Sequence, residues 1–414
     1  MVNYKSILSE IQQTYLEDTI PWIIGFSGGK DSTTVLQMVF QALSGLPKRQ
    51  LKKEIHIICN DTLVENPAIE EYIDNQLKKI KTAGKKRLFS HNSNLFKVIK
   101  VTPKLEDSFW VNLIGKGYPS PNHWFRWCTE RLKINPTSSY IKNMSQKNEK
   151  TIIILGTRKA ESTNRAASMK KYDNGAKLKR HRLPNVYVYT PIADLSNDEV
   201  WAYLLQVKNP WGINNRELLK LYGFACDMGE CPFVIETGTQ SCGKSRFGCW
   251  VCTVIDRDKS MENFVNNGHP WMKGLLDFRN WLYEIRQQSY QYVPKRIESK
   301  VKFGPFLSKT RQEILKRLLD LQECLSFELI APHELNYINE HLKKVSEDKT
   351  KQDMRKFIFD LQNGKRIVVI SDFNILLSSR NRLGSIHLKN VNLIKSRNLP
   401  AKYLHSSRVM YYEI

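Results

Sequence analysis

Residues 27–33, SGGKDST, decide the fold of this chain. They follow residues 20–26 (IPWIIGF), a short run rich in β-branched and aromatic residues that predicts a buried strand. They lead into residues 32–43 (STTVLQMVFQAL), where apolar side chains recur at the spacing of a helix. The sequence therefore predicts a strand, a tight glycine loop and a helix in direct succession.

A loop of this kind is suited to phosphate. Its two glycines allow a tight bend and a close approach to a ligand, and the helix start offers unpaired N–H groups and the positive end of the helix dipole. Lys30 adds a positive charge, Asp31 can hold Mg²⁺, and Ser32 or Thr33 can cap the helix or donate to phosphate. The spacing of the common P-loop is absent, and the order of residues instead resembles the pyrophosphatase loop of the ATP α-hydrolases, with an ordinary capped Gly-Gly turn as the alternative. We predict that ATP binds at Ser27, Gly28, Gly29, Lys30, Asp31 and Ser32.

Length and composition are those of an ordinary globular protein. A chain of 414 residues is long enough for two or three domains, and 41% hydrophobic with 25% charged residues is typical of soluble proteins. No apolar run approaches the ~20 residues of a membrane span, and the N-terminal pattern is that of an amphipathic helix rather than a signal peptide. We expect a cytoplasmic protein, with domains at 1–207, 208–300 and 301–414, the last mainly helical.

The chain is strongly basic, with 64 Lys and Arg against 41 Asp and Glu and a net charge of +23. An excess of this size favours a polyanion, above all nucleic acid, as a partner, although many basic proteins are merely soluble. Residues 168–183 (SMKKYDNGAKLKRHRL) read as a basic loop that either orders on a nucleic-acid backbone or is a disordered insertion.

Strands and helices alternate through the first 200 residues, which predicts an α/β fold with a mostly parallel, doubly wound sheet. We expect strands at 21–26, 54–60, 96–102, 150–156 and 185–192, and helices at 5–17, 32–44, 66–82, 107–115 and 196–207. Further along, the spacing predicts helices at 308–323, with Ser308 as N-cap, and at 332–344, and an apolar run predicts a strand at 367–370.

Ligands of such sheets bind beyond the carboxyl ends of the strands, and polar residues follow two of them. An asparagine and an aspartate follow residues 54–60, where an adenine or a ribose can lie. Residues 156–165 (GTRKAESTNR) place two arginines and a glutamate on one face if they are helical, an arrangement that can grip phosphates or form a solvated salt-bridged helix start. The predicted ATP site therefore also includes Asn60, Asp61, Gly156, Arg158, Glu161 and Arg165.

Five of the eight cysteines fall within residues 226–252. In a cytosolic chain such a cluster favours a metal over disulfides. Four thiolates complete either a zinc site or a 4Fe–4S cluster, and the spacing does not choose between them; buried cysteines without a ligand are the alternative. The expected ligands are Cys231, Cys242, Cys249 and Cys252, with Cys226 as a spare.

Cys128 lies apart from this cluster, in residues 124–133 (WFRWCTERLK), with three cations nearby. Positive neighbours lower the pKa of a thiol, so we expect a thiolate that carries a persulfide, binds an anion or ligates the cluster. A packed residue between two tryptophans is the structural alternative.

The phosphate loop, residues 156–165 and residues 191–201 (PIADLSNDEVW) together resemble the PAPS-reductase family of ATP α-hydrolase-like, or PP-loop, proteins. Within that family, three segments look like the DndC-type proteins of bacterial DNA phosphorothioation: 109–112 (FWVN), 126–133 (RWCTERLK) and 246–253 (RFGCWVCT). The resemblance covers about residues 15–320 and is weak beyond residue 325.

This resemblance implies an ATP pyrophosphatase with Mg²⁺ and a 4Fe–4S cluster, whose partners are DNA, a cysteine desulfurase and other DNA phosphorothioation proteins. The implied chemistry adenylates a DNA phosphate and then replaces a non-bridging oxygen with sulfur. Catalytic roles fall to Lys30, Asp31, Cys128 and Arg158. The candidates for DNA contact are Arg126, Arg131, Lys133, Lys179, Arg180 and Arg182.

Three rival functions share parts of this pattern. A PAPS or adenylyl sulfate reductase shares the fold but needs a late nucleophilic cysteine, and no cysteine follows Cys324. A tRNA thiolase also adenylates an oxygen and exchanges it for sulfur, and the net charge suits it equally well. A DNA-binding scaffold that retains the nucleotide fold is the non-enzymatic alternative, against which the intact phosphate loop speaks.

Overall fold

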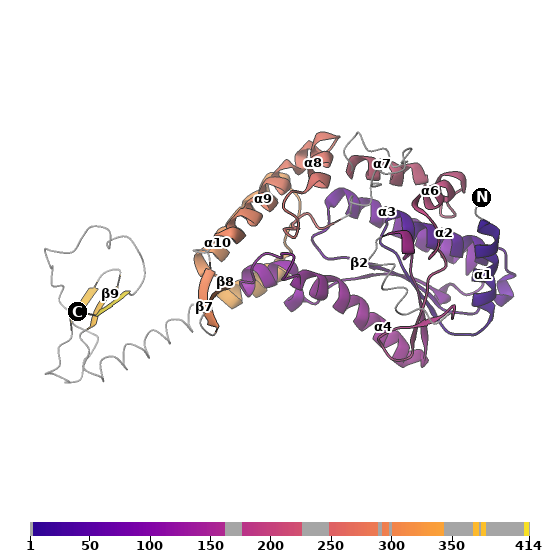
Figure 1. Ribbon diagram of the computed structural model, residues 1–414, viewed down its shortest axis with the longest axis horizontal. Coiled ribbons are helices and arrows are strands. Elements are labelled where there is room, and N and C mark those ends of the chain that lie inside the picture. The colour runs from indigo at the N-terminus through magenta and orange to yellow at the C-terminus, as the bar shows by residue number, and fades with distance from the viewer. Residues whose placement is uncertain are drawn as a thin grey trace. The chain divides into compact units, whose positions relative to one another are not determined.

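The computed structural model describes residues 3–161, 176–225, 248–288, 292–297, 300–342, 367–371, 374–377 and 410–413 (Figure 1). The chain forms two compact units, residues 1–338 and 339–414. The described part of the second unit contains an antiparallel sheet in the order β10-β9-β11, made of β9 (Ile367–Ser371), β10 (Asn374–Leu377) and β11 (Met410–Glu413). The strand expected at 367–370 is therefore confirmed.

A six-stranded sheet in the order β3-β2-β1-β4-β6-β5 forms the centre of the first unit (Figure 1). All neighbouring strands are parallel except β5, which runs antiparallel to β6 at one edge. The strands are β1 (Trp22–Gly25), β2 (Ile55–Asn60), β3 (Phe96–Val101), β4 (Thr151–Ile154), β5 (Lys179–Arg180) and β6 (Val186–Tyr189). The mostly parallel sheet and its five expected strands are confirmed, whereas β5 corrects the expectation of a loop throughout 168–183.

The chain changes direction across the sheet at β1. It winds outward from β1 through β2 to β3, and then returns to β4 on the other side of β1. Trp22 at the start of β1 pairs with Ile55 on one side and with Ile152 on the other. The loops after β1 and β4 therefore border the switch in strand order, where α/β sheets bind their ligands.

Helices cover both faces of this sheet because successive strand residues point to opposite sides. Ile24 and Ile57 join the core beneath α1 (Tyr4–Leu16), α2 (Lys30–Ser44), α3 (Pro67–Ala83) and α6 (Asn197–Gln206). Ile23 and Ile58 instead join a smaller core with α4 (Asn135–Asn148) on the other face (Figure 1). The helices expected at 5–17, 32–44, 66–82 and 196–207 are confirmed to within two residues at each end.

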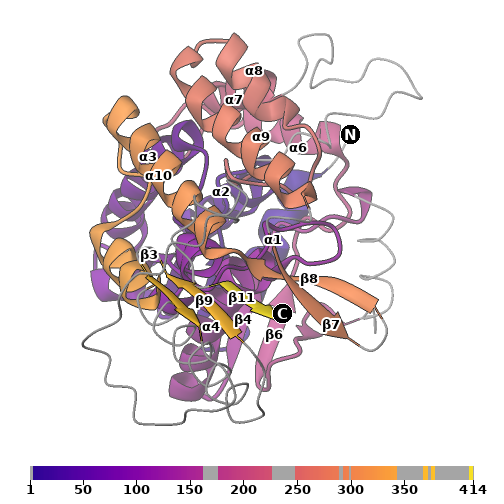
Figure 2. The ribbon, with the colours of Figure 1, turned by 90° about the vertical axis from the view of Figure 1, so that its left-hand side faces the viewer.

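Beyond residue 208 the described chain is mainly helical, and α7, α8 and α9 lie together at one end of the unit (Figure 2). α10 begins at Ser308 with Leu307 as its N-cap, which corrects the expectation that Ser308 is the cap. Arg311 of α10 donates to the carbonyls of Ile114 and Gly115, which fixes this helix to the first unit's centre. The elements are α7 (Asn215–Ala225), α8 (Lys259–Asn266), α9 (Lys273–Gln287), β7 (Tyr292–Ile297), β8 (Lys300–Phe306), α10 (Ser308–Leu325) and a helix at 332–342.

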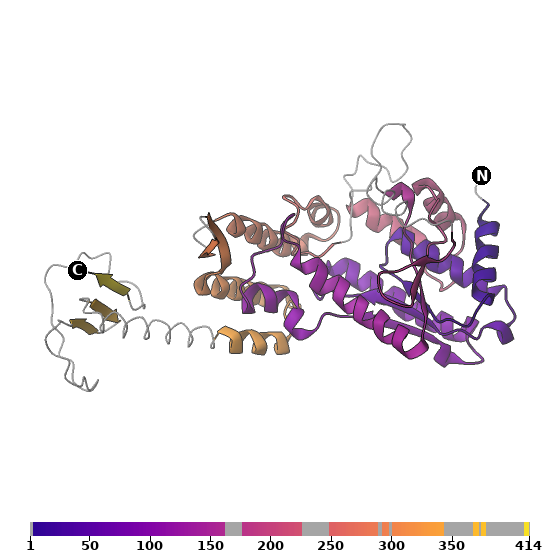
Figure 3. The ribbon, with the colours of Figure 1, turned by 60° about the horizontal axis from the view of Figure 1, so that its bottom comes forward.

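Two segments differ from expectation. α4, the long magenta helix of Figure 3, was not predicted because only two apolar residues among its 14, Ile141 and Met144, are buried. The helix expected at 107–115 is replaced by a 3₁₀ turn that ends at Asp107 and a π-helical turn over Val111–Gly115, and the Ser108 carbonyl accepts from both the backbone N–H and the side-chain amide of Asn112. The short turns are η1 (Lys48–Gln50), η2 (Gly84–Leu88), η3 (Ser93–Leu95), η4 (Leu105–Asp107), η5 (Val111–Gly115), η6 (Thr129–Ile134), η7 (Lys159–Glu161) and η8 (Pro270–Met272).

Among the helices that the structure describes, none combines the length and the apolar character needed to cross a bilayer.

Candidate functional site

The loop after β1 is closed by its own serines. Gly28 has a φ of +73°, and a Cβ at this position would lie 2.7 Å from the Ile73 side chain, so only glycine fits without strain. Ser32 Oγ donates to the Gly29 carbonyl at 3.0 Å and accepts from the Ser27 N–H at 3.2 Å. α2 starts at Lys30 with Gly29 as N-cap and no side-chain cap, which corrects the expectation that Ser32 or Thr33 caps it. The first N–H groups of α2 are therefore not satisfied by a capping side chain.

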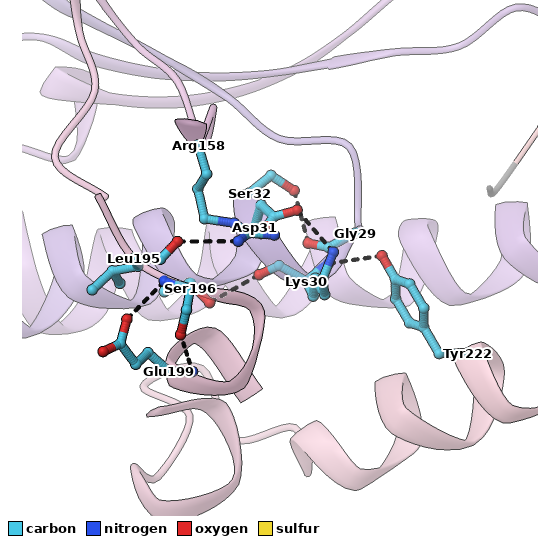
Figure 4. Close-up of polar contacts among 10 residues, drawn as sticks. Gly29, Lys30, Asp31, Ser32, Arg158, Leu195, Ser196, Glu199 and Tyr222 are labelled. Atoms are coloured by element: carbon cyan, nitrogen blue, oxygen red, sulfur yellow. Dashed lines mark hydrogen bonds and ion pairs between the residues drawn. The ribbon is translucent and has the colours of Figure 1, made fainter. Parts of the chain in front are cut away.

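The loop after β4 meets the loop after β1 through an ion pair (Figure 4). Arg158 Nε donates to Asp31 Oδ1 at 2.6 Å and Arg158 Nη1 to the Leu195 carbonyl at 3.1 Å, with the arginine side chain only 2% exposed. The other oxygen of Asp31 lies 3.1 Å from Lys30 Nζ. A Cβ at Gly156 would lie 2.7 Å from the Asp31 carbonyl, so the two loops are in direct contact. The structure thus brings Lys30, Asp31, Gly156 and Arg158 together.

Tyr222 of α7 reaches the same place from a distant part of the chain (Figure 4). Its hydroxyl accepts the Lys30 N–H at 3.2 Å, and Lys30 Nζ lies 5.6 Å from the centroid of its ring. The ring packs edge-on against Trp201, 5.2 Å between centroids. The sequence did not single out Tyr222, because the pattern of α7 shows only an amphipathic helix. A phosphate that takes the Lys30 N–H must replace this hydroxyl.

A cavity of about 440 Å³ opens from the phosphate loop, a volume in the range of small-molecule sites. Its near end is polar, its walls are apolar, and its far end is again polar. The near end consists of Ser27, Asp31, Ser32, Gly156 and Thr157, the walls include Phe26, Ile58, Ile69, Ile73 and Leu155, and the far end consists of Asn60, Glu65, Lys133 and Thr137.

The two residues expected after β2 have different surroundings. Asn60 lines the cavity, and its amide donates to the Leu132 carbonyl at 2.9 Å and accepts from Thr137 Oγ1 at 3.2 Å. Asp61 is paired with Lys100 at 2.8 Å and is not among the residues that line the cavity. Asn60 is therefore placed to meet a nucleotide, whereas the Asp61 carboxylate is held in an ion pair.

The second half of the cysteine motif lies beside Glu65, one of the residues that line the cavity. Cys249 pairs with Glu65 in an isolated β-bridge, and its sulfur lies 3.3 Å from Thr62 Oγ1. The Cys252 N–H donates to the Cys249 carbonyl at 3.1 Å, which makes this Cys-x-x-Cys a tight turn. The other expected ligands, Cys231 and Cys242, and the spare Cys226 lie outside the described residues. Within the described ranges, no group of three or more His, Cys, Asp or Glu is arranged to hold a metal ion.

Cys128 precedes η6, whose Lys133 lines the cavity. Burial raises the pKa of the Cys128 thiol, Cys252 raises it further, and Lys133 lowers it by a smaller amount. This corrects the expectation of a lowered pKa, since burial outweighs the cations nearby. Cys249 is the main cause of a raised pKa of Lys133, and Cys128 and Cys252 contribute. Lys133 therefore lines the cavity and is close enough to these cysteines for their charges to act on it.

The first group of predicted DNA contacts divides in the structure. Arg126 is exposed, with its guanidinium 3.1 Å from His123 Nδ1. Arg131 instead donates to Asp107 at 2.9 Å, to Asn112 at 2.8 Å and to the Tyr118 hydroxyl at 3.0 Å. Three internal bonds commit its guanidinium to holding η6 in place. Arg126 and Lys133 are the members of this group placed to meet a substrate.

The second group lies at the other edge of the sheet. Lys179 and Arg180 form β5, and Arg182 follows in the turn before β6. That turn is close to the amino end of β4, because the Asn185 carbonyl accepts the Thr151 N–H at 3.1 Å. Arg182 is thus far from the carboxyl ends that carry the cavity. Glu161 ends η7, and Arg165 lies outside the described residues, so their shared face with Arg158 stays a prediction.

Sequence comparison relates this chain to known proteins. The family described as "Phosphoadenosine phosphosulfate reductase domain" matches residues 21–254, more than half of the chain. An uncharacterized protein of Methanocaldococcus jannaschii is 26% identical over 285 residues, which cover 67% of this chain and 46% of that protein. The match therefore spans less than half the length of this relative.

Solved structures of related architecture are more distant. The phosphoadenylyl-sulfate reductase of Candida auris, in its phosphate complex, has a TM-score of 0.30 and 14% identity over 53% of this chain and 93% of its own. The tRNA thiolase NcsA of Methanococcus maripaludis, with its [4Fe-4S] cluster, has a TM-score of 0.28 and 16% identity over 72% and 84%. At such scores the structural similarity supports no argument, and the family assignment rests on the sequence match.

Proposed function

Because the chain belongs to the phosphoadenosine phosphosulfate reductase domain family, we propose that it is an ATP pyrophosphatase that adenylates a DNA backbone phosphate so that sulfur can replace a non-bridging oxygen. One observation carries the proposal. A single cavity is lined both by the phosphate loop and by Lys133, and the charges of Cys249, Cys128 and Cys252 act on Lys133. Activation by ATP and delivery of sulfur can therefore take place in one enclosure.

In the first step a non-bridging oxygen of DNA attacks the α-phosphorus of ATP. The new phosphorus–oxygen bond forms as the bond to the β-phosphate oxygen breaks, and pyrophosphate leaves. The free N–H groups of α2 hold the leaving pyrophosphate once Tyr222 releases the Lys30 N–H. Lys30 and Arg158 offset the charge that builds up, which is the main requirement of phosphoryl-type transfer.

The family resemblance implies a Mg²⁺ ion and a 4Fe–4S cluster, and the residues of this site fit these two groups to different degrees. Gly156, which has no side chain, lines the cavity where it contacts the Asp31 backbone. Both Asp31 oxygens already contact a cation, so a Mg²⁺ ion held there takes the place of Lys30, whose contact is the longer one. A 4Fe–4S cluster on Cys249 and Cys252, with Cys231 and Cys242, would supply a soft site at which sulfide is held.

In the second step hydrosulfide, derived from a cysteine desulfurase, attacks the adenylated DNA phosphorus. The phosphorus–sulfur bond forms, the bond to the AMP oxygen breaks, and the proton of hydrosulfide is released to solvent. Oxidation states do not change, so no further reductant is needed once hydrosulfide is present. Lys133, at the far end of the cavity, is placed to stabilise the entering sulfur anion.

The test is pyrophosphate release by the protein purified without oxygen, after its iron and sulfide have been assayed. ATP is supplied with DNA, with tRNA or with adenylyl sulfate, and sulfur in the nucleic acid is measured separately. We expect DNA to stimulate release, Lys30→Ala to abolish it, and Lys273→Ala, an exposed lysine of α9, to leave it unchanged.

The arms of this experiment separate the alternatives. Stimulation by tRNA alone identifies a tRNA thiolase, which is the second candidate because the net charge and the cavity suit either acceptor. Formation of sulfite and AMP from adenylyl sulfate and a thiol reductant, without pyrophosphate release, identifies a reductase-type enzyme. No turnover with any acceptor, in the presence of the partner proteins, leaves a nucleic-acid-binding scaffold and ends the proposal.

A further inference from the structure

One large apolar side chain stands in solvent. Trp124 is 97% exposed, whereas the other large apolar side chains of the described residues are at most 48% exposed. Tryptophan has the largest surface of all side chains, and leaving that surface in water is unfavourable. Tryptophan is enriched at binding interfaces, so a side chain exposed to this degree is a candidate contact for a partner.

The loop that carries Trp124 is held in a defined conformation. Asn122 Oδ1 accepts the N–H groups of Trp124 and Phe125, both at 2.8 Å. The Pro121 carbonyl accepts from Thr253 Oγ1 at 2.7 Å and from Arg286 at 2.7 Å. The backbone on both sides of Trp124 is therefore held by hydrogen bonds, and its side chain is exposed to solvent.

The neighbouring aromatic residues point the other way. Trp127 stacks on Phe109 with 5.4 Å between ring centroids, and its indole N–H donates to the Pro119 carbonyl at 2.9 Å. Phe125 packs toward Tyr118, 6.2 Å between centroids. The loop thus buries Trp127, leaves Phe125 43% exposed beside Tyr118, and presents Trp124 to solvent.

The charge beside Trp124 suits a polyanion. Arg126 and His123 flank it, are both exposed, and lie in a chain with a net charge of +23. An exposed aromatic ring next to an arginine is the pattern by which proteins stack on a base while they neutralise its phosphate. Tryptophan and arginine are also common at protein–protein interfaces, so loss of a protein partner with unchanged nucleic-acid binding is an outcome of the test.

We propose that Trp124 stacks on an unpaired or unstacked base of the nucleic-acid substrate. Trp124 is four residues from Cys128, so their Cα atoms are at most ~14 Å apart, and the stacked base lies near the phosphate that is to be modified. The inference rests on the proposed function only in taking a nucleic acid as the acceptor. Beyond the proposed function, the inference states that the Trp124 side chain contacts a base and that this base is unstacked from its neighbours.

The test is the binding of the full-length protein to a fluorescent single-stranded oligonucleotide and to a duplex, over a series of salt concentrations. We expect Trp124→Ala to weaken single-strand binding about 5- to 150-fold, which corresponds to the roughly 1–3 kcal/mol of one base–aromatic stack. Because stacking releases no counterions, the slope of log K against log salt stays unchanged. Arg126→Ala should instead reduce that slope by about one, as loss of a phosphate contact does.

Two controls bear on the chemistry of the contact. Trp124→Phe keeps a stacking ring and should recover most of the affinity. Trp271→Ala removes a tryptophan that is 43% exposed on η8 and should have no effect.

The outcomes separate this inference from the proposed function. Three results for Trp124→Ala overturn this inference without affecting the proposed function. They are wild-type affinity for nucleic acid, a reduced slope of log K against log salt, and loss of a protein partner with unchanged nucleic-acid binding. Failure of the wild-type protein to bind any nucleic acid overturns both. Base stacking without nucleic-acid-stimulated pyrophosphate release keeps the inference and removes the proposed chemistry.

Discussion

Replacement of Gly156 by alanine is a direct test of how the site is assembled. This glycine follows β4 and touches the backbone of the phosphate loop. An alanine Cβ would lie 2.7 Å from the carbonyl carbon and the oxygen of Asp31 and 2.9 Å from the Ser32 nitrogen. All three are backbone atoms, so no side-chain rotation relieves the clash.

The size of the effect follows from these distances. The shortest contact must lengthen from 2.7 to at least 3.4 Å, which separates the two loops by about 0.7 Å. Overpacking of this kind costs about 1–3 kcal/mol of folding stability. A misplacement of about 1 Å in an active site can cost about 100-fold in rate, so we expect pyrophosphate release to fall by about 10- to 100-fold.

The assay compares pyrophosphate release and thermal unfolding of Gly156→Ala, the wild type and a matched control. Gly223 of α7 serves as the control, because a Cβ there meets nothing within 4 Å and alanine is the better helix former. Gly223→Ala should keep full activity and gain up to about 1 kcal/mol of stability. Wild-type turnover in a Gly156→Ala protein that is fully folded at the assay temperature would refute the assembly of the site described above.

Three further substitutions test individual contacts. Asp31→Asn leaves Arg158 buried without its counter-charge and should lower the free energy of unfolding, measured in urea, by about 3 kcal/mol. The double variant Asp31→Asn with Arg158→Met should recover most of this loss. A double variant as unstable as Asp31→Asn alone would contradict the importance of this ion pair. Tyr222→Phe removes the hydroxyl that accepts the Lys30 N–H. Calorimetry should then show pyrophosphate binding about fivefold more tightly, because one hydrogen bond contributes about 1 kcal/mol. Weaker binding would show that the hydroxyl contacts the phosphate instead. Burial lowers the pKa of His56 in the folded protein below its ordinary 6.5. As the pH falls, the unfolded chain therefore binds a proton at this histidine before the folded protein does. The contribution of His56 to the free energy of unfolding is complete above pH 6.5 and is lost as the pH falls toward the pKa of the folded protein. His56→Gln should reduce the drop in melting temperature between pH 7.5 and 5.5, and an equal drop in both proteins would exclude His56 as its source.

The fold was predictable where local pattern and packing agree. Strands of the sheet are short runs of β-branched residues bounded by polar turns, and each such run in the first 200 residues became a strand. Helix α4 was not predicted, because Ile141 and Met144 are too few to produce a helical period in a polar segment. Strand β5 was not predicted, because its two basic residues form a strand only through pairing with β6. Both are cases in which tertiary contact decides the local structure.

The site was predictable to the extent that its residues are contiguous. The phosphate loop is predicted from seven successive residues. Tyr222, which contacts the Lys30 N–H, and Glu65, which lines the cavity, come from segments with no distinguishing sequence. Arg126 and Arg131 look alike in sequence, five residues apart. Only their partners separate them, because Arg131 is held by Asp107 while Arg126 is exposed. Charge counts alone therefore overstate the surface available to a nucleic acid.

The size of the cavity bears on how a polymer can be its substrate. About 440 Å³ has room for a nucleotide, but a nucleic-acid helix cannot enter, so the polymer must bring a single phosphate to the opening. Turning one phosphate inward disturbs the stacking of the adjacent base, at a cost of a few kcal/mol. An exposed tryptophan that restacks this base returns roughly 1–3 kcal/mol, which is a comparable amount. Under the proposed function, Trp124 is thus expected to offset the distortion that a small activation site imposes on a large substrate, and the loss of affinity in Trp124→Ala measures that contribution.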